Sequence, residues 1–91
     1  MTEMDKLDAA LTEMGIEHTY DKEFQNNGAQ IVVTENGEYL WDAICTSYSY
    51  GGAEGLLEVM GEPLLGNGND VQGCLTAEGV LWMMKGGAQC T

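Results

Sequence analysis

The sequence predicts an α+β fold in which a small three-stranded antiparallel sheet carries helices on one face, in the order α-β-β-β-α-α. Three observations predict it. Apolar residues recur at helical spacing near the start of the chain, two β-branched and aromatic runs flank an Asn-Gly pair, and two short apolar helical patterns follow. With 91 residues, the chain is expected to form one domain over 1–91.

The first helix is predicted over 3–14. Thr2 can cap its start and Gly15 its end, and acidic residues in the first turn suit the positive end of a helix dipole. Its apolar face is expected to consist of Met4, Leu7, Leu11 and Met14.

Strands are predicted over 16–20, 29–34 and 38–45, with 21–28 as a loop. Asn36-Gly37 between the last two is a strong hairpin signal. Counting outward from this turn pairs Val33 with Leu40 and Ile31 with Asp42. One sheet face would then carry Ala29, Ile31, Val33, Leu40, Asp42 and Ile44, and the other Val32, Thr34, Tyr39, Trp41, Ala43 and Cys45.

The later elements are predicted as helices over 52–60 and 77–85, joined by a loop over 62–73 and followed by a tail over 86–91 that frays. The two helical segments contain similar sequences, "AEGLLEVM" and "AEGVLWMM". Thr76 can cap the second of them. Two copies are too few for a repeat architecture, so the similarity indicates a common way of starting a short helix.

Asp42 stands between apolar residues on the face assigned to the core. A buried carboxylate must accept hydrogen bonds, and the nearest donors along the chain belong to the "SYSYGG" segment. We therefore expect Asp42 to fasten this connection, while Gly51 and Gly52 allow its turn. The alternative is an Asp42 that faces a partner.

The net charge of −12 is the strongest functional signal. Such a chain is repelled by nucleic acid and by anionic membranes and is attracted to basic protein surfaces, although an acidic surface can also serve solubility alone. The acidic start lacks the pattern of a signal peptide and no apolar run is long enough to span a membrane, so a cytoplasmic location is expected.

Catalytic, cofactor-binding and metal-binding residues are not predicted. Cys45, Ser47 and Ser49 precede a predicted helix start, but His18 is the only available histidine base and no nucleophile motif surrounds them. The segment "GNGNDVQG" does not match a calcium-binding loop. The odd number of cysteines, Cys45, Cys74 and Cys90, indicates thiols rather than a disulfide framework.

Partner binding is the predicted role of two sets of side chains. Acidic residues would meet basic groups, and aromatic residues inside an acidic rim would supply the buried contact. The acidic set is Glu35, Glu38, Glu54, Glu58 and Glu62, and the aromatic set is Tyr39, Trp41, Tyr48, Tyr50 and Trp82.

The stretches "LWDAICTSYSYGGAEGLLEVMG" and "GCLTAEGVL" resemble a group of short acidic proteins encoded in prophages and mobile elements of gut anaerobes. This resemblance implies a phage-associated context and no activity. In size, acidity and predicted element order, the chain is also similar to small acidic anti-CRISPR proteins. That similarity implies a DNA mimic that occupies the basic cleft where Cas9 reads its PAM, and it carries over no residue roles.

The function expected from the sequence is therefore that of a non-enzymatic inhibitor that binds a basic nucleic-acid-binding surface of a host effector such as Cas9. It would contact no nucleic acid or membrane directly and need no cofactor. The alternative is a small homo-oligomeric accessory or regulatory protein, with the aromatic sheet face as its dimer interface. A third possibility is an enzyme that uses Cys45 or Ser47, but the sequence suggests no substrate for it.

Overall fold

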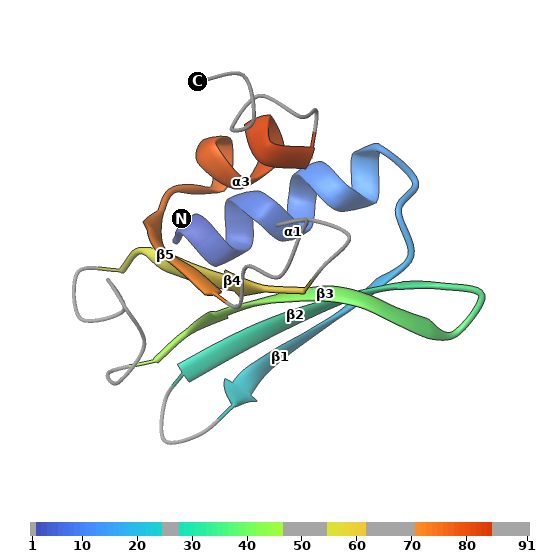
Figure 1. Ribbon diagram of the computed structural model, residues 1–91, viewed down its shortest axis with the longest axis horizontal. Coiled ribbons are helices and arrows are strands. Elements are labelled where there is room, and N and C mark those ends of the chain that lie inside the picture. The colour runs from blue at the N-terminus through green and yellow to red at the C-terminus, as the bar shows by residue number, and fades with distance from the viewer. Residues whose placement is uncertain (1, 25–27, 47–54, 62–70, 85–91) are drawn as a thin grey trace.

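In the computed structural model, the described part of the chain forms a five-stranded antiparallel sheet with two helices on one face (Figure 1). The structure describes residues 2–24, 28–46, 55–61 and 71–84. Neighbouring strands in the chain are neighbours in the sheet, in the order β1-β2-β3-β4-β5. The elements are α1 (Glu3–Glu13), β1 (His18–Phe24), β2 (Gly28–Glu35), β3 (Glu38–Cys45), β4 (Leu57–Met60), β5 (Val71–Leu75) and α3 (Ala77–Met84).

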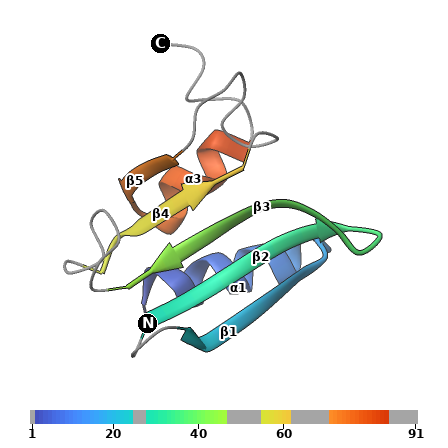
Figure 2. The same ribbon diagram turned by 60° about the horizontal axis from the view of Figure 1, so that its bottom comes forward.

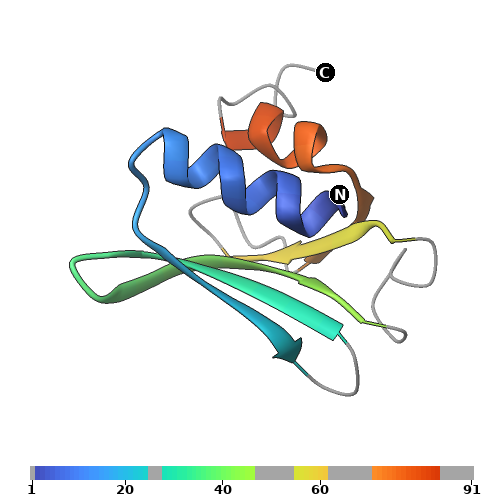
Figure 3. The same ribbon diagram turned by 180° about the vertical axis from the view of Figure 1, so that it is seen from behind.

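The predicted three-stranded sheet and its element order are wrong, although the α+β class and the placement of helices on one face are confirmed. Part of the predicted helix 52–60 is strand β4, and the end of the predicted loop 62–73 is strand β5. Strand β1 also extends into the predicted loop 21–28. Both helices lie on the same side of the enlarged sheet when the molecule is seen from the front and from behind (Figures 1 and 3).

Helix α1 begins as predicted. The Asp5 N–H donates to the Thr2 hydroxyl and the Thr2 N–H donates to the Asp5 carboxylate, which forms a reciprocal capping box. Met4, Leu7 and Leu11 are buried as expected, whereas Met14 is half exposed at the helix end. Gly15 follows with a φ of +72°, a conformation that favours glycine.

Two acidic residues of α1 bind side chains of β1. The Tyr20 hydroxyl donates to Asp5 over 2.8 Å, and His18 Nε2 lies 2.8 Å from Asp8 Oδ1. His18 and Tyr20 both belong to the sheet face beneath the helices, because they pair with Val33 and Ile31 of β2. Polar contacts therefore join α1 to an edge strand of the sheet.

The hairpin of β2 and β3 forms at Asn36-Gly37 as predicted, but its register shifts by one residue. Glu35 pairs with Glu38 and Thr34 with Tyr39, after which Val33 pairs with Trp41 and Leu40 becomes the extra residue of a β-bulge. The shift reverses the predicted faces of β3 from this point onward. Trp41 and Ala43 lie in the core, and Asp42 lies on the opposite face.

Strand β4 alternates in burial as a strand with one covered face does. Leu57 and Val59 are buried, Glu58 is half-buried and Met60 is exposed. Its pairing with β3 places Val59 beside Ala43 and Met60 beside Asp42. This pairing, which is distant in sequence, replaces the helix that the local pattern predicted.

Helix α3 starts where expected, and the last residue of its predicted range, 85, lies outside the described residues. The Gly79 N–H donates to the Thr76 hydroxyl over 3.0 Å, as the predicted cap requires. The Ala77 N–H, which has no partner within the helix, donates to the Glu3 carboxylate of α1 over 2.7 Å. The first turn of α1 thus stabilises the start of α3, and the two helices lie side by side (Figure 3).

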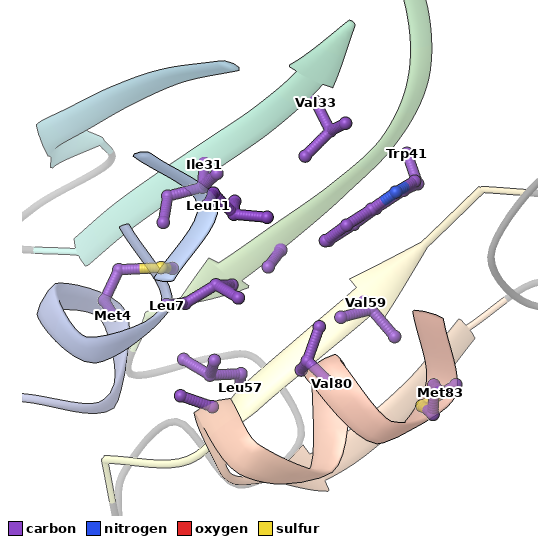
Figure 4. Packing of buried hydrophobic residues seen from close by; sticks show 12 residues of the cluster. Met4, Leu7, Leu11, Ile31, Val33, Trp41, Leu57, Val59, Val80 and Met83 are labelled. Carbon is purple, nitrogen blue, oxygen red and sulfur yellow. The ribbon is translucent and has the colours of Figure 1, made fainter. Parts of the chain in front are cut away.

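The core lies between the helices and the sheet. Figure 4 shows side chains from both helices and from β2, β3 and β4 converging on one cluster. Leu7, Leu11, Ile31, Leu57, Val59 and Val80 are its largest fully buried members. Trp41 joins this cluster and is only 4% exposed. Because both described helices lie on this side of the sheet, neither covers the opposite face.

Candidate functional site

The candidate site is the sheet face that points away from both helices, seen with the sheet in front in Figure 2. Pairing across β2, β3 and β4 aligns Val32, Asp42 and Met60 in one row and Gln30, Ile44 and Glu58 in the next. We call this surface the open face. Its members are Gln30, Val32, Tyr39, Asp42, Ile44, Glu58 and Met60.

Asp42 is held at the centre of the open face by neutral donors. Gln30 Nε2 donates to Asp42 Oδ2 over 3.2 Å, and the Tyr39 hydroxyl donates to Asp42 Oδ1. The carboxylate is half-buried, so these bonds compensate part of the hydration that it loses. Two strands and the end of the hairpin thereby fix a negative charge on a surface that the helices do not cover.

Tyr39 is the aromatic member of this face, and its side chain is 52% exposed. Its oxygen also lies 3.2 Å from the Met60 carbonyl oxygen, so the ring leans from β3 across to β4. Desolvation, the hydrogen bond to Asp42 and the negative charge of Asp42 all raise the pKa of the Tyr39 phenol. The phenol therefore stays neutral at physiological pH and continues to donate its hydrogen bond to Asp42.

Apolar side chains surround this pair. Met60 is 45% exposed, and Val32 and Ile44 are half-buried in the same two rows. These side chains make a partly exposed aliphatic and aromatic surface around the fixed carboxylate of Asp42.

Acidic residues at the hairpin tip extend this surface. Glu35 and Glu38 are exposed and directly opposite each other, an arrangement of like charges that costs stability. Of the lysines that the structure describes, Lys6 pairs with Glu3 and Lys22 lies over the Tyr20 ring. The described basic side chains therefore leave the hairpin tip uncompensated.

The structure brings only some of the predicted partner-binding residues together. Tyr39 and Glu58 lie on the open face, and Glu35 and Glu38 adjoin it. Trp41 was predicted on the same face as Tyr39 and is instead in the core, because the bulge at Leu40 turns it inward. Trp82 is 52% exposed but belongs to helix α3, in the other layer.

The prediction for Asp42 is also corrected. Asp42 was expected in the core, fastening the segment after β3, and it lies on the open face with Tyr39 and Gln30 as its partners. The segment 52–60, which was predicted to be the helix that Asp42 caps, contains strand β4. The remaining predicted residues lie outside the described part of the chain: Tyr48, Tyr50, Gly51, Gly52, Glu54 and Glu62.

Sequence reasoning missed Gln30, Ile44 and Met60 as members of this face. The alternation of β2 contained the signal for Gln30, but Ile44 was assigned to the core by the unshifted register. Met60 could not be found, because it stands in a segment whose pattern predicts a helix.

The thiol and imidazole considered for catalysis are not brought together. His18 aligns through Val33 with Trp41, whereas Cys45 lies at the other end of β3. Burial raises the pKa of the Cys45 thiol, which disfavours the thiolate. Among the described residues, no group of three histidine, cysteine or acidic side chains is placed to hold a metal ion.

The described helices include none that is long and apolar enough to cross a membrane. Comparison of the chain with protein-family models, curated proteins and solved structures finds no match. The functional argument for this protein accordingly rests on its own surface.

Proposed function

We propose that this protein is a non-enzymatic acidic binding protein whose open face docks on a basic, nucleic-acid-binding surface of another protein. The main support for this proposal is the combination of a net charge of −12 with an open face where exposed Tyr39 and Met60 surround the fixed carboxylate of Asp42. Acidic groups take the place of phosphates, and the apolar groups supply contact area that bare charge lacks.

The rigidity of the open face supports the proposal. A carboxylate held by two neutral donors keeps its charge in one position, so it loses little side-chain entropy when a guanidinium or ammonium group binds it. The uncompensated Glu35 and Glu38 add long-range attraction and a faster encounter with a basic partner.

A CRISPR effector of the Cas9 type is the specific partner that we propose to test, in a phage or mobile-element context. Cas9 has a basic site that reads the PAM, which an acidic protein can occupy. The element order that resembled anti-CRISPR proteins is overturned by the five-stranded sheet, so acidity and size are the remaining arguments for this partner.

The test is a titration of guide-loaded Cas9 with this protein, followed by competition with a duplex that contains the PAM. We expect binding that excludes the duplex and weakens steeply as salt rises. The double variant Tyr39→Ala with Asp42→Asn should lose affinity about tenfold or more, as hot-spot contacts do. Glu23→Gln, at the other end of β1, is the exposed-acid control. Affinity that is insensitive to salt, or equal losses in both variants, contradicts the proposal.

Self-association is the second candidate function, because Tyr39, Met60, Val32 and Ile44 form a partly exposed apolar surface that a second copy can cover. Asp42 and Glu58 on the same face oppose it through like-charge repulsion. Light scattering after size exclusion separates the candidates. A dimer that dissociates in Tyr39→Ala favours a homo-oligomeric accessory protein, and a monomer favours the acidic binding protein.

A further inference from the structure

A groove on the helix side of the hairpin, in the other layer from the open face, has a volume of about 410 Å³. Three segments that are distant in sequence form it: the connection from α1 to β1, the β2–β3 hairpin and the end of α3. Its lining residues are Gly15, Ile16, Glu17, Val33, Thr34, Glu35, Asn36, Leu40, Trp41 and Met84.

The floor of the groove is apolar. Val33 and Trp41 are buried and connect it to the core, and they lie next to each other at one end of the cluster in Figure 4. Ile16, Leu40 and Met84 are half-buried around them. The bulge creates this floor, because it directs both Leu40 and Trp41 toward the helix side of β3.

Two of the residues that line the groove, Glu17 and Glu35, are acidic. Glu17 Oε2 accepts the Thr34 hydroxyl over 2.6 Å and the Gly37 N–H over 2.9 Å. The bond from Thr34 and then those from the hairpin backbone lower the pKa of Glu17, so it remains charged and held in place. Glu35 is exposed beside it and makes no side-chain hydrogen bond with another described residue.

Trp41 also offers a hydrogen-bond donor. Its indole N–H donates to no described residue, yet no described side-chain nitrogen is both fully buried and without a partner. The nitrogen is therefore reachable by solvent, although the ring as a whole is buried. A peptide carbonyl is a suitable acceptor for such a group.

We propose that this groove binds a short peptide segment of a partner protein in which a lysine or arginine lies next to an aliphatic side chain. The aliphatic group covers Trp41 and Leu40, and the basic group reaches Glu17 and Glu35. Charge complementarity selects this occupant: an acidic segment is repelled by both carboxylates, and a purely apolar one leaves them without a partner. The site goes beyond the proposed function, since it lies outside the open face.

The experiment follows Trp41 fluorescence in the full chain carrying Trp82→Phe, which leaves Trp41 as its single tryptophan. The probe is the blocked peptide acetyl-Leu-Arg-Leu-amide, compared with acetyl-Leu-Glu-Leu-amide and acetyl-Ser-Arg-Ser-amide. We expect a saturable change with the first peptide and none with the other two. Absence of saturation with the first peptide, or equal binding of the glutamate peptide, overturns the proposal.

Matched variants separate the groove from general charge attraction. Glu17→Gln keeps an oxygen acceptor for Thr34 and Gly37, and we expect it to weaken binding of the arginine peptide about two- to fivefold. Glu23→Gln removes the same charge at the far end of β1 and should leave the affinity unchanged. Glu35→Gln replaces Glu17→Gln if thermal unfolding shows that the latter is not folded. Equal weakening in the groove and control variants overturns the proposal, whereas Asp42→Asn tests only the open face.

Discussion

Tyr39 and Asp42 form a hydrogen bond in which a neutral phenol, rather than a cation, stabilises the carboxylate. Gln30 completes the arrangement from the neighbouring strand. Replacing either donor leaves a half-buried carboxylate with less compensation, and hydrogen bonds to charged groups contribute more than neutral ones. The pair therefore contributes to stability as well as to the proposed surface.

Substitution of Asp42 by Asn should lower the pKa of Tyr39 toward that of an ordinary tyrosine. Desolvation is the largest cause of the raised pKa and remains, while the charge and the bond to the carboxylate are removed, so the pKa should fall only part of the way. The measurement is a titration of tyrosinate absorbance. The titration curve of the unmodified chain and that of Asp42→Asn are each corrected by subtracting the curve of the same protein with Tyr39→Phe, which leaves the titration of Tyr39 alone. Circular dichroism verifies the fold at each pH.

The same shift fixes the sign of the pH effect on stability. A pKa raised above the ordinary tyrosine value of 10.0 stabilises the folded state fully below pH 10.0, and this stabilisation is lost as pH rises through the folded-state value. The free energy of unfolding should thus decrease with pH in the alkaline range, and less steeply in Tyr39→Phe. An unchanged slope in that variant would contradict the role given to the pair.

At the scale of elements, the bulge in β3 is supported by a close approach of the chain after β4. Gly61 has a φ of +132°, and a Cβ at this position would lie 2.5 Å from Trp41 Cβ and 2.7 Å from the Leu40 carbonyl oxygen. Only glycine fits there without a shift of backbone. Gly61, which directly follows β4, is therefore matched to the two residues of the bulge, Leu40 and Trp41.

Gly61→Ala should lower the free energy of unfolding by about 2–4 kcal/mol, because it adds backbone strain to overpacking against Trp41. Gly37→Ala is the matched control: Gly37 also has a positive φ, +84°, but a Cβ there meets nothing within 4 Å. Its expected cost is about 1 kcal/mol, from the backbone conformation alone. Urea denaturation of both variants measures the difference, and equal costs would argue against a tight contact at Gly61.

The similar segments "AEGLLEVM" and "AEGVLWMM" explain which elements could be predicted from the sequence. Helix α3, helix α1 and the hairpin have local signals in caps and turn residues, and the structure has them where they were predicted. The first segment contains β4 instead of a helix. Its apolar residues fit both periods, because Leu56 and Met60 have helical spacing whereas Leu57 and Val59 alternate as in a strand. Pairing with β3, which no local pattern reveals, decides between them.

The candidate site was only partly predictable for the same reason. The acidity of Glu35 and Glu38 and the exposure of Tyr39 follow from sequence and turn position. The exchange of Trp41 and Asp42 between faces depends on a single extra residue in β3, and a register that is wrong by one residue inverts every later assignment. The groove depends on the same bulge, and so it could not be predicted either.

At the scale of the whole molecule, carboxylates serve two separate purposes. Glu3, Asp5, Asp8 and Glu17 accept hydrogen bonds that connect one element to another. A second set is exposed and has no side-chain hydrogen bond or ion pair with another described residue: Glu13, Glu23, Glu35, Glu38 and Glu78. The first set stabilises the fold, whereas the second adds repulsion and remains available to a basic partner.

Salt should therefore act in opposite directions on folding and on binding. The melting temperature of the isolated protein should rise with sodium chloride, because screening relieves repulsion at a net charge of −12; each kcal/mol gained raises it by roughly 4–8 °C.

Glu38→Lys replaces the repulsion across the hairpin tip with attraction to Glu35, so it should melt higher at low salt and respond less to added salt. Glu78→Lys makes the same charge change on α3 without an opposing Glu35. Differential scanning calorimetry across salt concentrations measures all three proteins. A melting temperature that falls with salt would show that attractive charge pairs dominate the folded state. That result would contradict the proposal that the exposed acidic residues are available to a basic partner.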